Sequence, residues 1–211
     1  MKKITLLLAI FLFTASLCAQ NAALTVPKFK GIEITGTVDQ FGSQILSQGF
    51  TFVGKQSYGS IYLGRFAGMD DCFVILVPVE NSNDIASVNV MIGLKISEYG
   101  DVYSYETWEK LLGDYEDLKE LLTKKYGEPT EQNAGFSKDA STSSSFMKLY
   151  AVKDGQSEYY AEWGDPDIDK MVVRISIAGG KSMGFDCAVI VLTYWNVEKS
   201  KDSEKEIIDD L

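Results

Sequence analysis

Three aspartates alternate along the chain at Asp165, Asp167 and Asp169, as the first ligands of a calcium-binding loop do. Such a loop needs a glycine at its sixth position and a glutamate at its twelfth. Here Lys170 occupies the sixth position, and no glutamate stands at the twelfth. We therefore predict a solvated turn between two strands, and no metal site.

Two glutamates, Glu158 and Glu162, lie four residues apart in a predicted strand, so both side chains could face the same side. Pairs of carboxylates carry out the hydrolysis of glycosidic bonds, which makes this pair a candidate for acid–base chemistry. Alternating glutamates on a strand are more commonly its solvent-exposed face. We predict the exposed face and keep the hydrolytic pair as the alternative.

The complete absence of histidine excludes many kinds of active site. Without imidazole there is no Ser-His-Asp or Cys-His pair to activate a nucleophile. The usual ligands of catalytic zinc and the usual proton carrier near neutral pH are missing as well. We therefore expect a protein that is not an enzyme and that uses no cofactor.

The N-terminal segment has the composition of a cleavable signal peptide. Lys2 and Lys3 precede an apolar run over residues 4–13, and small residues up to Ala19 follow. The run is shorter than the roughly 20 residues that span a hydrocarbon core. We expect cleavage after Ala19, and hence a periplasmic or secreted protein. Lipidation at Cys18 is not expected, because the bulky Leu17 precedes it.

Cleavage leaves an acidic protein with two cysteines. Loss of residues 1–19 takes the net charge from −10 to −12, because Lys2 and Lys3 are removed. This charge repels phosphate backbones, so nucleic acid is not an expected partner, and no second apolar run is long enough to span a membrane. Cys72 and Cys187 could form a disulfide in an oxidising compartment, or could be two buried thiols in apolar strands. The sequence leaves both alternatives open.

Periodicity and turn residues predict two helices and eight strands. Thr37 and Gln40 form a capping box before a helix at 38–48, and Gly127 with Pro129 ends a longer amphipathic helix at 104–126. Between the helices we predict strands at 52–53, 58–66, 72–79 and 85–92. After a loop at 130–145 we predict strands at 146–152, 157–163, 170–178 and 186–195.

The same order of elements occurs twice, as one helix closed by glycine and then four strands. The best match aligns Tyr62, Gly64 and Phe66 with Tyr159, Ala161 and Trp163.

We therefore predict an α+β fold of two helix-plus-meander repeats, with antiparallel strands and with the helices on one face of the sheet. The predicted organisation is a signal peptide at 1–19, repeats at 20–97 and 98–197, and a charged tail at 198–211.

Two stretches of the chain, 29–66 and 108–129, resemble a group of uncharacterised exported proteins of gut bacteria. A glycine-closed helix followed by an antiparallel meander, twice over in an exported chain, also looks like the β-lactamase-inhibitory-protein-like architecture. The resemblance implies a fold, an exported compartment and protein binding on a concave sheet surface. It transfers no catalytic residue to this chain.

Aromatic residues are abundant, with 11 Tyr, 11 Phe and 3 Trp. Tyrosine and tryptophan combine an apolar ring with a polar tip, which suits binding surfaces as well as packing between a helix and a sheet. The candidate binding residues fall in two groups, Tyr99, Tyr103 and Tyr105, and Tyr159, Tyr160 and Trp163.

From these features we expect an exported, non-enzymatic protein that binds another protein or a glycan of the cell envelope. The alternatives are an exported hydrolase that uses carboxylates on an extracellular polymer, and a role in envelope assembly.

Overall fold

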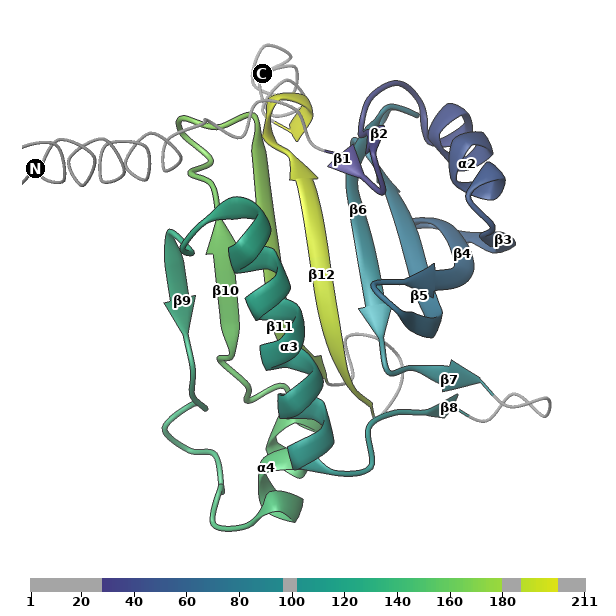
Figure 1. Ribbon diagram of the computed structural model, residues 1–211. Helices are drawn as coiled ribbons and strands as arrows, with labels where there is room; N and C mark the ends of the chain where they lie inside the picture. The colour runs from purple at the N-terminus through teal and green to yellow at the C-terminus, as the bar shows by residue number, and fades with distance from the viewer. Residues whose placement is uncertain (1–27, 97–101, 180–186, 201–211) are drawn as a thin grey trace, which may run out of the picture.

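The computed structural model describes residues 28–96, 102–179 and 187–200. These residues form one eight-stranded antiparallel sheet with the strand order β3-β4-β5-β6-β12-β11-β10-β9 (Figure 1). The sheet strands are β3 (Thr51–Gln56), β4 (Gly59–Phe66), β5 (Met69–Pro78), β6 (Ile85–Ile92), β9 (Glu131–Asn133), β10 (Tyr160–Trp163), β11 (Met171–Gly179) and β12 (Ala188–Asn196). The prediction of an α+β fold with antiparallel strands is confirmed.

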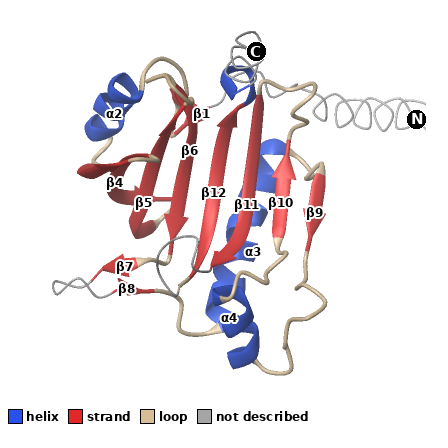
Figure 2. Cartoon of the chain, turned by 180° about the vertical axis from the view of Figure 1, so that it is seen from behind, coloured by secondary structure: helices blue, strands red, loops and turns tan. Residues whose placement is uncertain are grey.

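Helices cover one face of this sheet. Helix α2 (Val38–Ser47) packs against β5, whereas α3 (Trp108–Tyr126) and α4 (Ser145–Lys153) pack against β11 and β12. Two small hairpins, β1 (Lys28–Phe29) with β2 (Ile32–Glu33) and β7 (Lys95–Ile96) with β8 (Val102–Tyr103), lie outside the sheet. Seen from behind, the opposite face of the strands is turned to the viewer, with α3 and α4 beyond it (Figure 2). In the described ranges no helix is long and apolar enough to cross a membrane.

The sheet joins the two halves of the chain through one pair of strands. β6, the last strand of the first half, pairs with β12, the last strand of the second half. Their register places Ile92 opposite Ile190 and Val90 opposite Leu192. All four of these side chains are buried on the helix-covered face. The strand order is therefore fixed by contacts between residues about 100 positions apart.

The capping box predicted at the start of the first helix is present. The Gln40 amide N–H donates to the Thr37 hydroxyl over 3.2 Å, and the Thr37 amide N–H donates to the Gln40 side chain over 3.1 Å. This reciprocal pair satisfies two backbone donors that a helix start otherwise leaves unpaired. Val38, Phe41 and Ile45 then form the buried face of α2.

The long second helix begins later than predicted. Thr107 is its N-cap and accepts a hydrogen bond from the Lys110 amide over 3.3 Å, so residues 104–107 precede the helix. At the other end the Gly127 amide donates to the Thr123 carbonyl over 2.9 Å, which confirms the predicted glycine cap. The buried stripe of α3 consists of Trp108, Leu111, Tyr115, Leu118 and Leu122.

The prediction of a strand at 146–152 is wrong, because these residues form helix α4. Ser144 caps the helix by accepting a hydrogen bond from the Met147 amide over 3.3 Å. Leu149 and Val152, which are three residues apart, turn to the core, while Phe146 is 73% exposed. The predicted loop at 130–145 also contains the edge strand β9, which pairs with β10. The second half therefore differs from the first by a helix between its first two strands.

Candidate functional site

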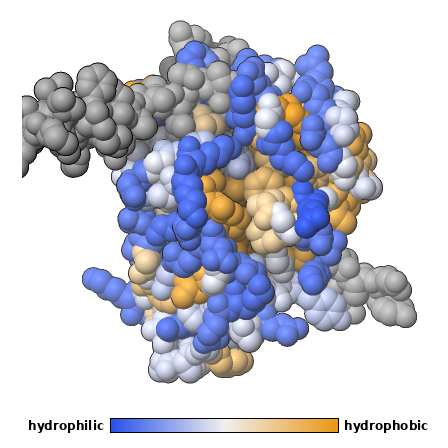
Figure 3. All heavy atoms as spheres, viewed as in Figure 1, coloured by the Kyte–Doolittle hydropathy of each residue, from blue (hydrophilic) through white to orange (hydrophobic). Residues whose placement is uncertain are grey.

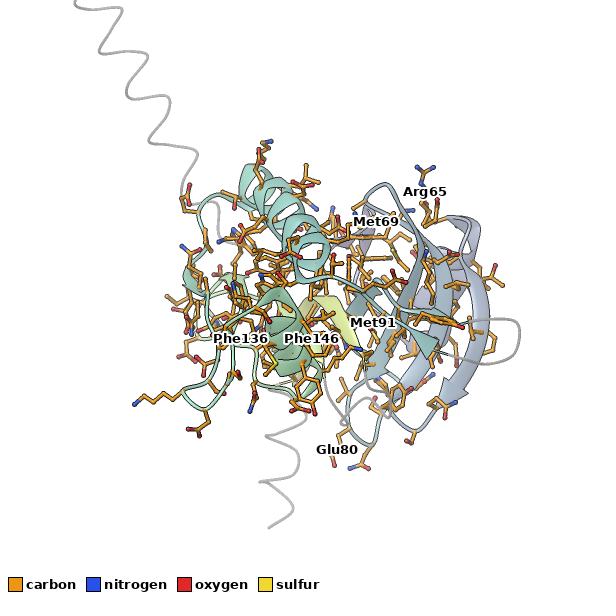
Figure 4. The ribbon with its side chains drawn as sticks, turned by 90° about the horizontal axis from the view of Figure 1, so that it is seen from below. Arg65, Met69, Glu80, Met91, Phe136 and Phe146 are labelled. Atoms are coloured by element: carbon orange, nitrogen blue, oxygen red, sulfur yellow. The ribbon has the colours of Figure 1, made fainter. Side chains whose placement is uncertain are left out.

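A groove runs along the helix-covered face between α3 and the first half of the sheet, and apolar side chains lie in its floor (Figure 3). One wall is α3, which contributes residues between Lys110 and Lys125. The other wall is the β4–β5 hairpin within residues 66–71, which are the end of β4, the turn and the start of β5. Viewed from below, Met69 lies on the side of this turn that faces α3, whereas Arg65 points away from the helix (Figure 4). We call this feature the central groove.

The larger part of the central groove is a hollow of about 760 Å³, which we call the tyrosine hollow. Tyr103 is 53% exposed at its edge, and Tyr105 lies deeper and is buried. The remaining lining combines apolar and charged side chains, including Met69, Ile92, Asp70, Asp71 and Lys95. Tyrosine and methionine are enriched at protein-binding surfaces, where charged side chains lie mainly at the rim.

A hydrogen-bonded group fixes the position of Tyr105. Its hydroxyl donates to the Asp114 carboxylate over 2.9 Å, and the Lys110 ammonium donates to the other oxygen of Asp114 over 2.6 Å. Burial and this carboxylate both raise the pKa of Tyr105, so its hydroxyl stays protonated and remains a donor. The Tyr105 ring also lies over Gly93, where a β-carbon would come within 2.1 Å of it. The tyrosine hollow is thus held in shape by α3 and by β6.

The smaller part of the central groove is a hollow of about 220 Å³, which we call the lysine hollow. Its lining consists of Lys30, Phe66, Ala67, Leu118, Leu121, Leu122, Lys125, Leu192 and Tyr194. Of the apolar members, Leu121 is 52% exposed while Phe66, Leu192 and Tyr194 are buried. The lining contains two cations and no acidic side chain, which sets it apart from the tyrosine hollow.

The structure divides the residues that the sequence marked as a binding surface. Tyr103 and Tyr105 share the tyrosine hollow, and Tyr99 lies outside the described residues. Tyr159 and Trp163 face the helices, where Tyr159 packs against the Trp108 ring at 5.2 Å between centroids.

Trp163 is only 1% exposed. Its indole N–H donates to the Gly127 carbonyl at the end of α3 over 2.8 Å. These two rings hold the helix to the sheet.

Tyr160 lies on the opposite face of β10, in a polar hollow of about 450 Å³. Its hydroxyl donates to Glu131, and the Arg174 guanidinium lies 4.2 Å from its ring centroid. Glu162 forms an ion pair with Arg174 at 3.5 Å. The pKa of Glu162 is raised overall. Burial is the largest cause, Arg174 acts in the opposite direction, and the negative charge of Glu131 adds to the increase.

The second glutamate of the predicted pair, Glu158, lines the same polar hollow and accepts a hydrogen bond from Asn133 over 3.4 Å.

The three aspartates Asp165, Asp167 and Asp169 lie in the predicted turn between β10 and β11. The Asp165 side chain accepts from the Asp167 amide over 2.9 Å, and the Asp169 side chain accepts from the Asp165 amide over 2.8 Å. Both contacts are typical of a turn that satisfies its own backbone. Over the described part of the chain, no group of three or more acidic or cysteine side chains could hold a metal ion.

The two cysteines belong to different groups of buried side chains. Cys72 lies in the main core under the helices, and Cys187 lies in a smaller cluster with Phe73 and Met91. Phe73 follows Cys72 directly in β5, and successive residues of a strand point to opposite faces. The sheet therefore separates the two clusters, and we favour two buried thiols over a disulfide.

Iodoacetamide should label Cys72 and Cys187 in the unfolded, unreduced protein made without residues 1–19, and mass spectrometry counts the adducts. In the folded protein at pH 8, Cys72 should stay unlabelled, because burial raises the pKa of its thiol to about 11 and only the thiolate reacts. A sample reduced before labelling is the control. Labelling of the unfolded protein that requires this reduction would demonstrate a disulfide instead.

Sequence reasoning missed most of the central groove. Lys30 and Lys125 carried no signal, because each is an ordinary surface residue until β1 and the β4–β5 turn approach α3. Leu121 gave a weak signal, since it lies outside the buried stripe of α3 and is nevertheless apolar. In comparisons with known proteins, no family model, curated protein or solved structure matches the chain.

Proposed function

We propose that the chain is an exported, non-enzymatic protein that binds another protein or a glycan of the cell envelope through the tyrosine hollow. The observation that carries the proposal is an open hollow of about 760 Å³ with an exposed tyrosine at its edge and a fixed tyrosine within it. Exposed tyrosine is enriched at binding surfaces because its ring buries apolar area while its hydroxyl keeps a polar partner.

The proposed compartment rests on residues 1–19, which lie outside the described part of the chain. Two lysines, an apolar run over residues 4–13 and a small residue at Ala19 support cleavage and release into the periplasm or the medium. The acidic charge of the remaining protein agrees with a soluble partner rather than an anionic membrane surface.

We also propose that the two halves are repeats of one helix-plus-meander unit in a β-lactamase-inhibitory-protein-like arrangement. The strand order supports this, because each half contributes its four strands in sequence, from the edge of the sheet to the central β6–β12 pair. Tyr62 lies below Gly42 of α2, as Tyr159 lies below Trp108 of α3. Helix α4 is then an insertion in the second unit.

The alternative of a carboxylate-dependent hydrolase would use the polar hollow beside Tyr160. Glu158 and Glu162 lie on that face, and the burial of Glu162 raises its pKa, as a general acid requires. However, Arg174 holds Glu162 in an ion pair, which favours the ionised carboxylate over the proton donor. We therefore favour binding over hydrolysis.

Affinity capture of the tagged protein from its native envelope tests the proposed binding role. Tyr103→Ala should reduce recovery of the partner about tenfold, because truncating a tyrosine that an interface buries costs about 1–2 kcal/mol. Tyr150→Ala, on α4, is the matched control because this tyrosine is 51% exposed and lies outside the groove. Quantitative mass spectrometry measures the recovery of the partner. Equal recovery with both variants would contradict the proposal.

The same capture addresses the third alternative, a role in envelope assembly. Recovery of envelope proteins in a fixed ratio to the tagged protein, unchanged by Tyr103→Ala, would favour that role over binding in the groove.

A further inference from the structure

We propose that the lysine hollow binds a small amphiphile with a single carboxylate, of the class of medium-chain fatty acids. The inference goes beyond the proposed function, because it concerns a small ligand at the other end of the central groove and needs no macromolecular partner. It depends on three properties of this hollow, which are its apolar floor, its size and its two cations.

The floor can receive an alkyl chain. Phe66, Leu122, Leu192 and Tyr194 line it with buried apolar surface, and Leu121 stands half-exposed at the edge. A bound chain would cover the exposed part of Leu121 and would remove its own methylene groups from water. Each buried methylene strengthens binding roughly fourfold.

The size favours a chain over a ring system or a folded segment. The volume is about 220 Å³, which is below the range of about 300–1,000 Å³ that accommodates drug-sized ligands. Leu121 and Lys125 of α3 are exposed members of the lining, so a ligand head group beside them would remain at the surface.

The two cations select the head group. The Lys30 ammonium lies 4.9 Å from the Phe50 ring centroid and donates to the Arg65 carbonyl over 3.3 Å. The Lys125 ammonium lies 4.7 Å from the Tyr126 ring centroid. Among the described residues neither lysine forms an ion pair with a carboxylate.

The neighbouring lysines of α3 behave differently. Lys110 is paired with Asp114, and Lys124 is paired with Glu120. Lys30 and Lys125 therefore have no carboxylate to give up when a ligand arrives, in a chain that has 30 acidic and 20 basic residues. The overall negative charge opposes polyanions, so a single carboxylate is the best match to this pair.

Isothermal titration of the purified exported protein with decanoate tests the inference. Decanoate should bind at one site, at least tenfold more tightly than decanol and decyltrimethylammonium, which have an alkyl chain of similar length and no negative charge. Octanoate should bind roughly fifteenfold more weakly than decanoate, because two buried methylene groups are lost. Equal binding of decanoate, decanol and decyltrimethylammonium, or no binding of decanoate, would overturn the proposal.

Variants locate the site. The double variant Lys30→Ala with Lys125→Ala should weaken decanoate binding at least tenfold and should leave decanol binding nearly unchanged. Leu121→Asp should weaken the binding of both probes, since it places a charge at the apolar edge. Lys124→Ala is the matched control on α3, because this lysine is outside the lining of the hollow and pairs with Glu120. Unchanged decanoate binding in the double variant would overturn the proposal.

Two further measurements distinguish a fatty acid from a peptide C-terminus as the ligand, and the lysine hollow from the tyrosine hollow as the site. N-acetyl-leucine presents the apolar side chain and the carboxylate of a peptide C-terminus, and tighter binding of it than of decanoate would replace the fatty acid by a peptide end. Tyr103→Ala should bind decanoate like the unmodified protein. Failure to capture a partner, together with retained decanoate binding, would therefore contradict only the proposal for the tyrosine hollow. The reverse result would contradict only the proposal for the lysine hollow.

Discussion

Replacing Trp163 with alanine should lower the free energy of unfolding by about 4 kcal/mol. The side chain is 1% exposed and is among the largest fully buried groups of the protein. It connects two elements, since its ring packs in the main core and its indole N–H donates to the Gly127 carbonyl at the end of α3. Alanine would leave a large cavity and a carbonyl without this donor, and both effects destabilise the folded state.

Urea unfolding followed by circular dichroism measures this effect. Trp163→Phe keeps most of the ring and loses the hydrogen bond, so it should cost about 1–2 kcal/mol. Trp195→Ala is the matched control, because Trp195 is 40% exposed on β12, and it should cost less than about 1 kcal/mol. Similar losses for Trp163→Ala and Trp195→Ala would show that Trp163 does not hold α3 to the sheet.

Gly93→Ala should lower the free energy of unfolding by about 3 kcal/mol, from two separate causes. Gly93 has a φ of +88°, where an L side chain costs about 1–2 kcal/mol. A β-carbon there would also lie 2.1 Å from the Tyr105 ring. The ring would have to move, and the hydrogen bond from Tyr105 to Asp114 at 2.9 Å would be lost with it.

Gly68→Ala separates the two causes. Gly68 has a similar φ of +86°, but a β-carbon there would meet nothing within 4 Å. It should therefore show the backbone cost alone, so urea unfolding should give about 1–2 kcal/mol less destabilisation than for Gly93→Ala. In the Tyr105→Ala background, where the ring is absent, Gly93→Ala should lower the free energy of unfolding by no more than Gly68→Ala does. Equal destabilisation by the two glycine substitutions would mean that the Tyr105 ring adapts without cost.

Local signals explain which helices could be predicted. The capping box at Thr37 and the glycine cap at Gly127 use contacts within four residues, so the sequence alone contains the determinants of α2 and of the end of α3. Helix α4 was not predicted, because its apolar and aromatic residues also fit a strand. Its packing on β11 and β12, from residues more than fifteen positions away, favours the helix there.

The central groove could not be predicted, because it depends on contacts between the two halves. Phe66 at the end of β4 lies beside Leu122 of α3 only because β6 pairs with β12 in the middle of the sheet. No local pattern specifies that pairing. The prediction of a binding region at Tyr103 and Tyr105 named two residues of the groove, from their aromatic character and their position where the halves join.

The central strand pair also sets an order of events as the chain is made and folds. β6 is complete long before β12 is synthesised, so a folded first half would present β6 as an unpaired edge rich in Val and Ile. Such edges recruit strands of other chains, and pairings across about 100 residues form slowly. Until the last strand arrives, the growing chain would be most at risk of aggregation. A chaperone that covers β6 during this interval would therefore raise the yield of folded protein.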